Sequence, residues 1–154
     1  MAVRPLAARP GRCYPRRAPA APTGDPPVNP TLLIAVAAGG AVGAIARYTV
    51  TSAVPRWLGH GFPWGTVVVN VAGSLLMGLL IDIMARRWSA PPEARVFLVT
   101  GVLGAFTTFS TFSLDVVTLY ERGALMAAAL YVAGSVIAGV LALFAGMWLG
   151  RVLL

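Results

Sequence analysis

The sequence predicts an all-α integral membrane protein with four transmembrane helices per subunit, and three observations lead to that class. Apolar residues make up 58% of the 154 residues and charged residues only 11%, whereas a soluble domain carries about 25% charged residues. The mean hydropathy is +0.79. The apolar residues gather in four blocks, each near the roughly 20 residues that a helix needs to cross a bilayer. This composition excludes water-soluble enzymes and ordinary nucleic-acid-binding modules.

Residues 1–30 are predicted to form a disordered extension, and residues 31–154 the four-helix transmembrane domain. The first 30 residues hold five of the 12 arginines and eight of the 12 prolines, and proline this dense blocks helix formation. The net charge of +7 comes mainly from this segment, so it does not indicate a nucleic-acid-binding face. A functional tail and a mis-called translation start both remain open as interpretations of the segment.

Four apolar blocks after Pro30 are each predicted to form a membrane-spanning helix: residues 32–54, 64–84, 96–120 and 123–150. The first three blocks carry one charge each, and the fourth carries none. A short loop containing Pro55 and Arg56 is expected between the first two helices. Small residues four positions apart, which allow helices to approach closely in lipid, occur in the pairs Gly39/Gly43, Ser74/Gly78, Ser135/Gly139 and Gly146/Gly150.

The arginines encode the orientation of the four helices only weakly. With four spans, both termini and the loop over residues 85–95 lie on one side, which then holds nine arginines against three on the other. The positive-inside rule places that side in the cytoplasm. Without the first 30 residues the count is four against three, as in proteins that insert both ways round.

The third block contains the pattern that points most directly to function. Two glycines precede five hydroxyl residues within seven positions in the run from Gly101 to Ser113, GVLGAFTTFSTFS. Glycine loosens a helix, and serine and threonine side chains compete for its hydrogen bonds. Non-helical backbone at membrane depth survives only inside protein or beside a polar cavity. We therefore expect a break whose freed carbonyls hold a cation; the alternative is a continuous helix joined to its neighbours by polar contacts.

Several side chains are candidates for binding a small anion. Phe109 and Phe112 lie three residues apart on one helical face, and the edge of an aromatic ring is electropositive. The Asn70 amide offers two hydrogen-bond donors. Tyr131 and Ser135 share one face of the fourth helix. The alternative for Asn70 is a polar contact that joins two helices, and the alternatives for the other residues are packing inside the protein or, for the phenylalanines, contact with lipid.

Two charged residues inside the blocks have alternative interpretations as well. Arg47 either extends its charge to the membrane interface or raises the anion concentration at a pore mouth. Asp115 is expected to pair or form hydrogen bonds within the protein, because a carboxylate facing lipid is costly.

Three stretches closely resemble the Fluc (CrcB) fluoride channels: Gly39 to Tyr48, Gly65 to Ser74 and Gly101 to Ser113. The resemblance covers essentially residues 32–150, and the run Gly-x-x-Gly-x-x-Thr-Thr-Phe-Ser-Thr-Phe is highly specific. It implies a fluoride-selective channel that exports fluoride passively and relieves its toxicity. It also implies a multi-pass protein of the cell inner (plasma) membrane, assembled as a dual-topology antiparallel dimer with two pores.

The resemblance also implies roles for individual residues. The fluoride pore would comprise Asn70, Phe109, Ser110, Thr111, Phe112, Tyr131 and Ser135. The backbone carbonyls of Gly104 and Thr107 would hold a structural sodium ion at the dimer interface, while Arg47 and Asp115 would lie at the pore mouth or serve the structure. The sequence departs from the family at Gly139, where a further hydroxyl is expected one helical turn after Ser135.

Two other functions remain as alternatives. A small four-span proton-coupled cation exporter needs a carboxylate in the membrane, normally in the first span, and Asp115 is the only deep candidate here. A non-conducting partner subunit of a heterodimeric fluoride channel is favoured by Gly139 alone. An enzyme is disfavoured because the sequence offers no base–nucleophile pair and no cluster of metal ligands.

Overall fold

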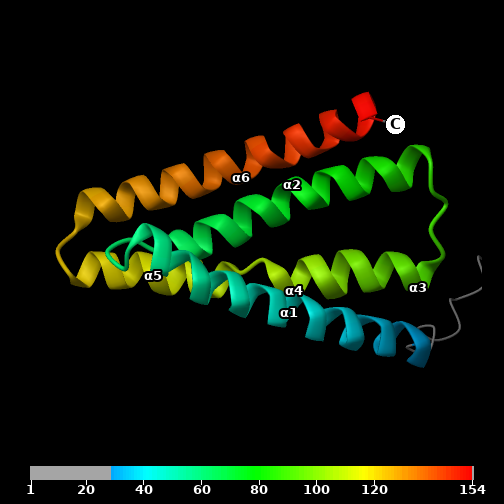
Figure 1. The fold of residues 1–154 in the computed structure, drawn as a ribbon, viewed down its shortest axis with the longest axis horizontal. Helices are drawn as coiled ribbons and strands as arrows, with labels where there is room; N and C mark the ends of the chain where they lie inside the picture. Colours follow the sequence, from blue (N-terminus) through cyan, green and yellow to red (C-terminus); the bar gives the residue numbers. More distant parts are fainter. Residues whose placement is uncertain (1–28, 154) are drawn as a thin grey trace, which may run out of the picture.

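The computed structural model describes residues 29–153, so the extension predicted over residues 1–30 lies almost entirely outside the described residues. Within this range the chain is a bundle of four long helical spans, each apolar and long enough to cross a membrane. These are α1 (Pro30–Leu58), α2 (Trp64–Arg86), the interrupted third span (Pro92–Glu121) and α6 (Leu125–Leu153). Figure 1 shows α6 beside α2, with α1 packed against the third span. The four predicted spans are confirmed.

The first helix is longer than the sequence indicated, and the loop expected at Pro55 and Arg56 is wrong. The α1 helix continues through Pro55 to Leu58. Proline removes only one helical hydrogen bond at this point, and membrane helices tolerate such a loss. The helix ends at Gly59, which has a positive φ of 87° and donates its N–H to the Pro55 carbonyl at 2.9 Å.

Glycines bring α2 and α6 into close contact along their length. A Cβ atom on Gly78 would overlap the Leu143 carbonyl, and one on Gly146 would overlap the Leu75 carbonyl. Gly139 lies beside Ser74 and Gly150 beside Asp82, so the residue numbers rise together along both helices and the two run parallel (Figure 1). These contacts confirm the prediction that small residues mediate helix packing here.

The α1 helix contacts the first half of the third span in the same way. Gly39 and Gly43 are buried, and a Cβ atom on either would overlap a backbone carbonyl, that of Phe97 or that of Val102 respectively. The backbone of the third span therefore lies directly against α1, with no side chains between them.

The third span is divided into four helical segments and contains the predicted break. They are α3 (Pro92–Arg95), the π-helical segment η1 (Val96–Leu103), α4 (Gly104–Phe106) and α5 (Phe109–Glu121). Between α4 and α5 the backbone is extended at two residues, with φ and ψ of −79° and 159° at Thr107 and −151° and 121° at Thr108. The break in the third helix is confirmed, whereas the π-helical segment was not predicted.

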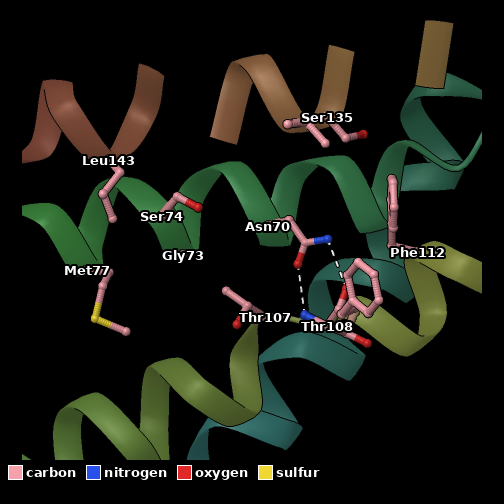
Figure 2. A pocket seen from close by; sticks show the side chains of 11 residues that line it. Asn70, Gly73, Ser74, Met77, Thr107, Thr108, Phe112, Ser135 and Leu143 are labelled. Carbon is pink, nitrogen blue, oxygen red and sulfur yellow. Dashed lines mark hydrogen bonds between the residues drawn. The ribbon is translucent and has the colours of Figure 1, made fainter. Parts of the chain in front are cut away.

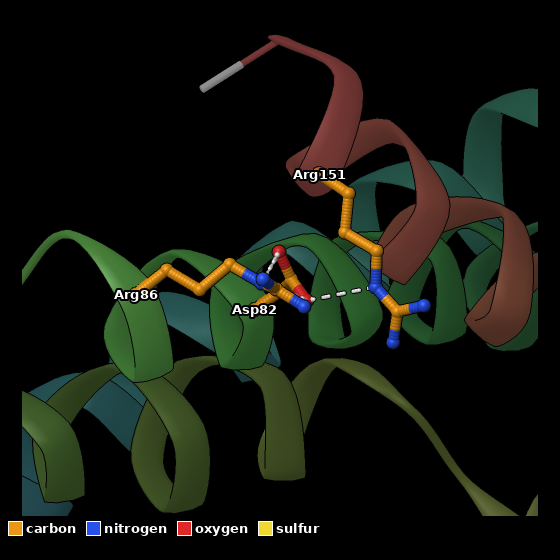
Figure 3. Close-up of polar contacts among 3 residues, drawn as sticks. All are labelled: Asp82, Arg86 and Arg151. Carbon is orange, nitrogen blue, oxygen red and sulfur yellow. Dashed lines mark hydrogen bonds and ion pairs between the residues drawn. The ribbon is translucent and has the colours of Figure 1, made fainter.

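Asp82 joins the ends of α2 and α6 through two arginines (Figure 3). Its carboxylate is 4% exposed and lies 3.1 Å from Arg86 Nε on α2 and 3.3 Å from Arg151 Nε on α6. Gly150 makes room for it, because a Cβ there would lie 3.0 Å from that of Asp82. A carboxylate buried at this depth is stable only with such partners.

We expect Asp82→Asn to lower the free energy of unfolding by about 1 kcal/mol, because it removes the negative charge that both arginines contact. The loss is this small because both arginines are half exposed, so solvent partly screens the ion pairs. The measurement is the midpoint of thermal unfolding in detergent. Glu121→Gln, which removes the same charge from the exposed end of α5, is the control and should leave the midpoint unchanged. Equal midpoints for the two variants would contradict the prediction.

Candidate functional site

Asn70 on α2 supports the break in the third span through both ends of its amide. Its Oδ1 accepts a hydrogen bond from the Thr108 N–H at 2.8 Å, and its Nδ2 donates to the Thr108 carbonyl at 3.0 Å. Figure 2 shows the two bonds side by side. Because Asn70 satisfies both backbone groups of one extended residue, the chain can leave the helix within the bundle at little cost in free energy.

The break frees the two carbonyls that were expected to hold a cation. In a continuous helix the N–H of residue i bonds to the carbonyl of residue i−4, so Gly104 and Thr107 would accept from Thr108 and Thr111. The Thr108 N–H goes to Asn70 instead, and the Thr111 N–H goes to the Thr108 hydroxyl at 3.2 Å. Both carbonyls thus lose their helical donors, and Gly104 is also exposed on the surface of the subunit.

Arg47 reaches the break from α1. Its Nη1 donates to the Thr107 carbonyl over 3.4 Å. The sequence left open whether its charge extends to the membrane interface; because α1 continues to Leu58, Arg47 lies about three turns before the end of that helix. The structure therefore brings the positive charge of Arg47 to the broken span.

A cavity of about 320 Å³ lies between the break, α2 and α6. Asn70 and Ser74 on α2 and Ser135 on α6 line it (Figure 2). The break and the start of α5 complete its wall with Thr107, Thr108, Phe109 and Phe112. Every residue that lines the cavity is uncharged. Four of the predicted pore residues, drawn from three separate stretches of sequence, therefore border one space.

The two phenylalanines differ in their surroundings. Their ring centroids are 5.8 Å apart, as expected for one helical face. Phe109 is 79% exposed on the surface of the subunit, whereas Phe112 is partly buried against the core, with its ring centroid 5.1 Å from that of Tyr131. Tyr131 in turn meets Phe62 edge to face at 5.5 Å. The rings thus extend from the surface of the bundle to its interior.

Asp115 is held inside the bundle by two hydroxyl groups. Its Oδ2 accepts from Thr66 Oγ1 at 2.7 Å and from the Tyr131 hydroxyl at 3.0 Å. Thr66 and Tyr131 are both buried, Tyr131 to 1% exposure. The expectation that Asp115 forms hydrogen bonds within the protein is confirmed. On the other side of Asp115 lies a second cavity of about 200 Å³, which His60 and Arg122 help to line.

The remaining predicted residues lie at the edges of this arrangement. Ser110 and Thr111 are exposed on the first turn of α5. The Thr111 hydroxyl accepts from that of Thr108 at 3.0 Å, so these hydroxyls form part of the N-terminal cap of α5. Ser135 has a buried Oγ that finds no hydrogen-bond partner within the part of the chain that the structure describes.

Sequence reasoning missed three residues of the site: Thr66, Ser74 and Thr108. Thr108 was visible only as one of five hydroxyl residues, although a threonine before an apolar helical run is a recognised N-cap signal. Thr66 lies four residues before Asn70 and thus on the same helical face, which could have identified it. Ser74 was noted only as a small residue for helix packing.

The arrangement is suited chemically to a small anion. A backbone break, neutral hydroxyl and amide groups and two aromatic rings surround one uncharged cavity, and the Arg47 guanidinium contacts the break beside it. Neutral donors replace part of the hydration shell of an anion, whereas a buried fixed charge would hold it too tightly for passage.

Comparison with known proteins agrees with this chemistry. Residues 34–147 match the family model described as "CrcB-like protein, Camphor Resistance (CrcB)". A "Fluoride-specific ion channel FluC" of Nitrobacter winogradskyi is 54% identical over 123 residues, covering 80% of this chain and 98% of that protein. The protein of the same name from Agrobacterium fabrum is 55% identical over 116 residues, covering 75% of this chain and 93% of that protein. The chain belongs to the CrcB-like family.

Proposed function

We propose that this protein is a fluoride-selective ion channel that lets fluoride leave the cell passively through the plasma membrane. The observation that carries the proposal is the break at Thr107 and Thr108, which Asn70 supports beside an uncharged cavity lined by Phe109, Phe112 and Ser135. The names of the relatives, which describe fluoride-specific ion channels, support it independently.

Fluoride is small and strongly hydrated, so its entry requires hydrogen-bond donors at close range. Asn70 uses one of its two N–H donors on the Thr108 carbonyl and keeps the other, and the Ser135 hydroxyl is unengaged within the described residues. The ring edges of Phe109 and Phe112 add weak positive potential. Conduction requires binding that is adequate but not tight, and neutral groups meet that condition.

The cation-exporter alternative loses its main support. The Asp115 carboxylate accepts two hydrogen bonds from buried hydroxyls on α2 and α6, which is the setting of a structural group. The relatives are named as ion channels and not as exporters of cations or as enzymes.

The single subunit leaves polar groups exposed at the middle of the bundle, and a second copy in the opposite orientation would cover them. Ser110 and Thr111 at the start of α5 are exposed, as is Gly104 with its freed carbonyl. In a lone subunit these groups would face hydrocarbon, which is costly for a backbone carbonyl. Outside the first 30 residues the arginines number four on one side and three on the other, and this near balance supports dual topology because the folded part encodes no strong preference for one orientation.

A structural sodium ion at this face is consistent with the donor set. The freed carbonyls of Gly104 and Thr107 are the kind of ligand that unwound membrane helices offer to sodium. Arg47 donates to the Thr107 carbonyl, but a carbonyl has two lone pairs, so one of them is left for the ion. A second copy would add its own pair of carbonyls. A bound cation would supply positive charge near the cavity and would join the two subunits.

We expect replacement of sodium by N-methylglucamine to lower both the dimer fraction in detergent and the fluoride flux. Light scattering reports the dimer fraction, and efflux from liposomes reports the flux. Potassium at equal ionic strength is the control, because it separates loss of sodium from loss of salt. Unchanged assembly and flux without sodium would contradict the sodium site.

The function itself is tested by fluoride efflux from liposomes that contain only this purified protein, with chloride as the second anion. Fast fluoride efflux without chloride efflux, lost in Phe109→Ile, supports a self-sufficient channel. No efflux from well-folded protein would contradict a self-sufficient channel and favour an obligate partner subunit. Equal efflux of both anions would contradict selectivity for fluoride.

A further inference from the structure

Ser74 is a second polar side chain that α2 presents to the cavity. It follows Asn70 by four residues, which places both on one helical face, and both line the cavity. Figure 2 shows Ser74 one turn further along α2 than Asn70, on the side where α6 passes. The cavity therefore continues along α2 beyond the residues that support the break.

The opposite helix has no side chain at the level of Ser74. On α6 the residue one turn after Ser135 is Gly139, and a Cβ atom built there would lie 3.6 Å from Ser74 Oγ. The close packing of Gly78 on Leu143 and of Gly146 on Leu75 fixes this register. Ser74 thus supplies a hydroxyl beside the point where α6 supplies none.

The Ser135 hydroxyl differs from several other hydroxyls of the bundle. Those of Thr49, Ser113 and Thr118 each donate to a carbonyl four residues earlier in their own helix. Ser135 Oγ is buried without such a bond in the described chain. A buried hydroxyl without a partner is destabilising, so this group is suited to a ligand that enters the cavity.

We propose that Ser74 is a fluoride-binding residue. It continues the line of hydrogen-bond donors that begins at Ser135 on α6, and it does so from α2, at the level where α6 has only Gly139. The proposal rests on the proposed fluoride conduction. A permeating fluoride would pass from the Asn70 amide and the Ser135 hydroxyl to the Ser74 hydroxyl, one helical turn further along.

The test is fluoride efflux from liposomes that contain the full chain with Ser74→Ala. Loss of a hydrogen bond to a charged ligand should slow efflux about tenfold. Thr49→Val removes a hydroxyl from the exposed side of α1 and should conduct like the unchanged protein. Gel filtration and the thermal midpoint establish that both variants fold.

The double variant Ser74→Ala/Gly139→Ser tests whether a donor is needed or only the shape of Ser74. A Cβ at 139 fits at ordinary contact distance, so this variant returns a hydroxyl to the same level from α6. We expect it to recover most of the lost flux. If Ser74→Ala does not fold, Ser74→Cys takes its place, because a thiol has a similar shape but is a weak donor.

The outcomes distinguish a failure of the role of Ser74 from a failure of the channel function. If the unchanged protein conducts fluoride and Ser74→Ala conducts equally well, the role of Ser74 is overturned while the channel function stands. A slow Ser74→Ala variant that Gly139→Ser does not restore also overturns it, because the site then needs shape and not a donor. If the unchanged protein conducts no fluoride, the channel function fails and the role of Ser74 fails with it.

Discussion

Asn70→Asp should abolish fluoride conduction. The aspartate keeps the oxygen that accepts from the Thr108 N–H but replaces the amide donor to the Thr108 carbonyl with a second oxygen. It also places a negative charge on the wall of the cavity. Repulsion between unit charges about 4 Å apart is of the order of 4 kcal/mol near a protein surface, which corresponds to roughly a thousandfold in rate.

The chain offers a matched control for this substitution. Asn29 caps the N-terminus of α1 by accepting from the Thr31 N–H at 2.9 Å, and aspartate caps a helix equally well. Asn29→Asp therefore introduces the same charge outside the cavity and should conduct normally in the liposome assay. If Asn70→Asp conducts within about tenfold of the unchanged protein, fluoride does not pass this residue.

Gly146→Ala should destabilise the bundle strongly, although alanine is the better helix former. Its Cβ would overlap the Leu75 carbonyl on α2, and a backbone carbonyl cannot move aside as a flexible side chain does. Overpacking of this kind costs about 1–3 kcal/mol, more than the roughly 1 kcal/mol that alanine gains over glycine within a helix.

Gly134→Ala on the same helix is the control. A Cβ at Gly134 meets no atom within 4 Å, so this variant should be neutral or slightly more stable. The comparison is made by the thermal midpoint and by the fraction of monodisperse protein after heating in detergent. Equal stability of the two variants would mean that α2 and α6 can separate without loss.

The break in the third span could be predicted from the sequence because its cause is local. Glycines and hydroxyl residues over Gly101 to Ser113 weaken the helix by themselves. The partner of the break could not be predicted, because Asn70 is 38 residues away and its position depends on how α2 packs. The sequence therefore indicated that Asn70 either joins two helices or donates to the ion, but it could not identify Thr108 as the residue to which the amide bonds.

Other features depend on packing that no local pattern encodes. The π-helical turn over Val96–Leu103 consists of residues that are equally compatible with an α-helix, and it lies where the backbone meets Gly39 and Gly43. Small residues at a spacing of four were interpreted as packing residues throughout. This was correct for Gly78 and Gly146 but incomplete for Ser74, because a small residue can also face a cavity.

The dependence of the broken span on Asn70 has a consequence for the order in which the chain enters the bilayer during its synthesis. The Thr108 N–H leaves the helical pattern and bonds to Asn70, and such a group costs several kcal/mol when it is exposed to lipid without a partner. Because α2 is made before the third span, Asn70 is already in the membrane when Thr108 arrives. A chain rearranged so that the third span is made before α2 would insert poorly, because Asn70 would not yet be in the membrane when Thr108 enters it.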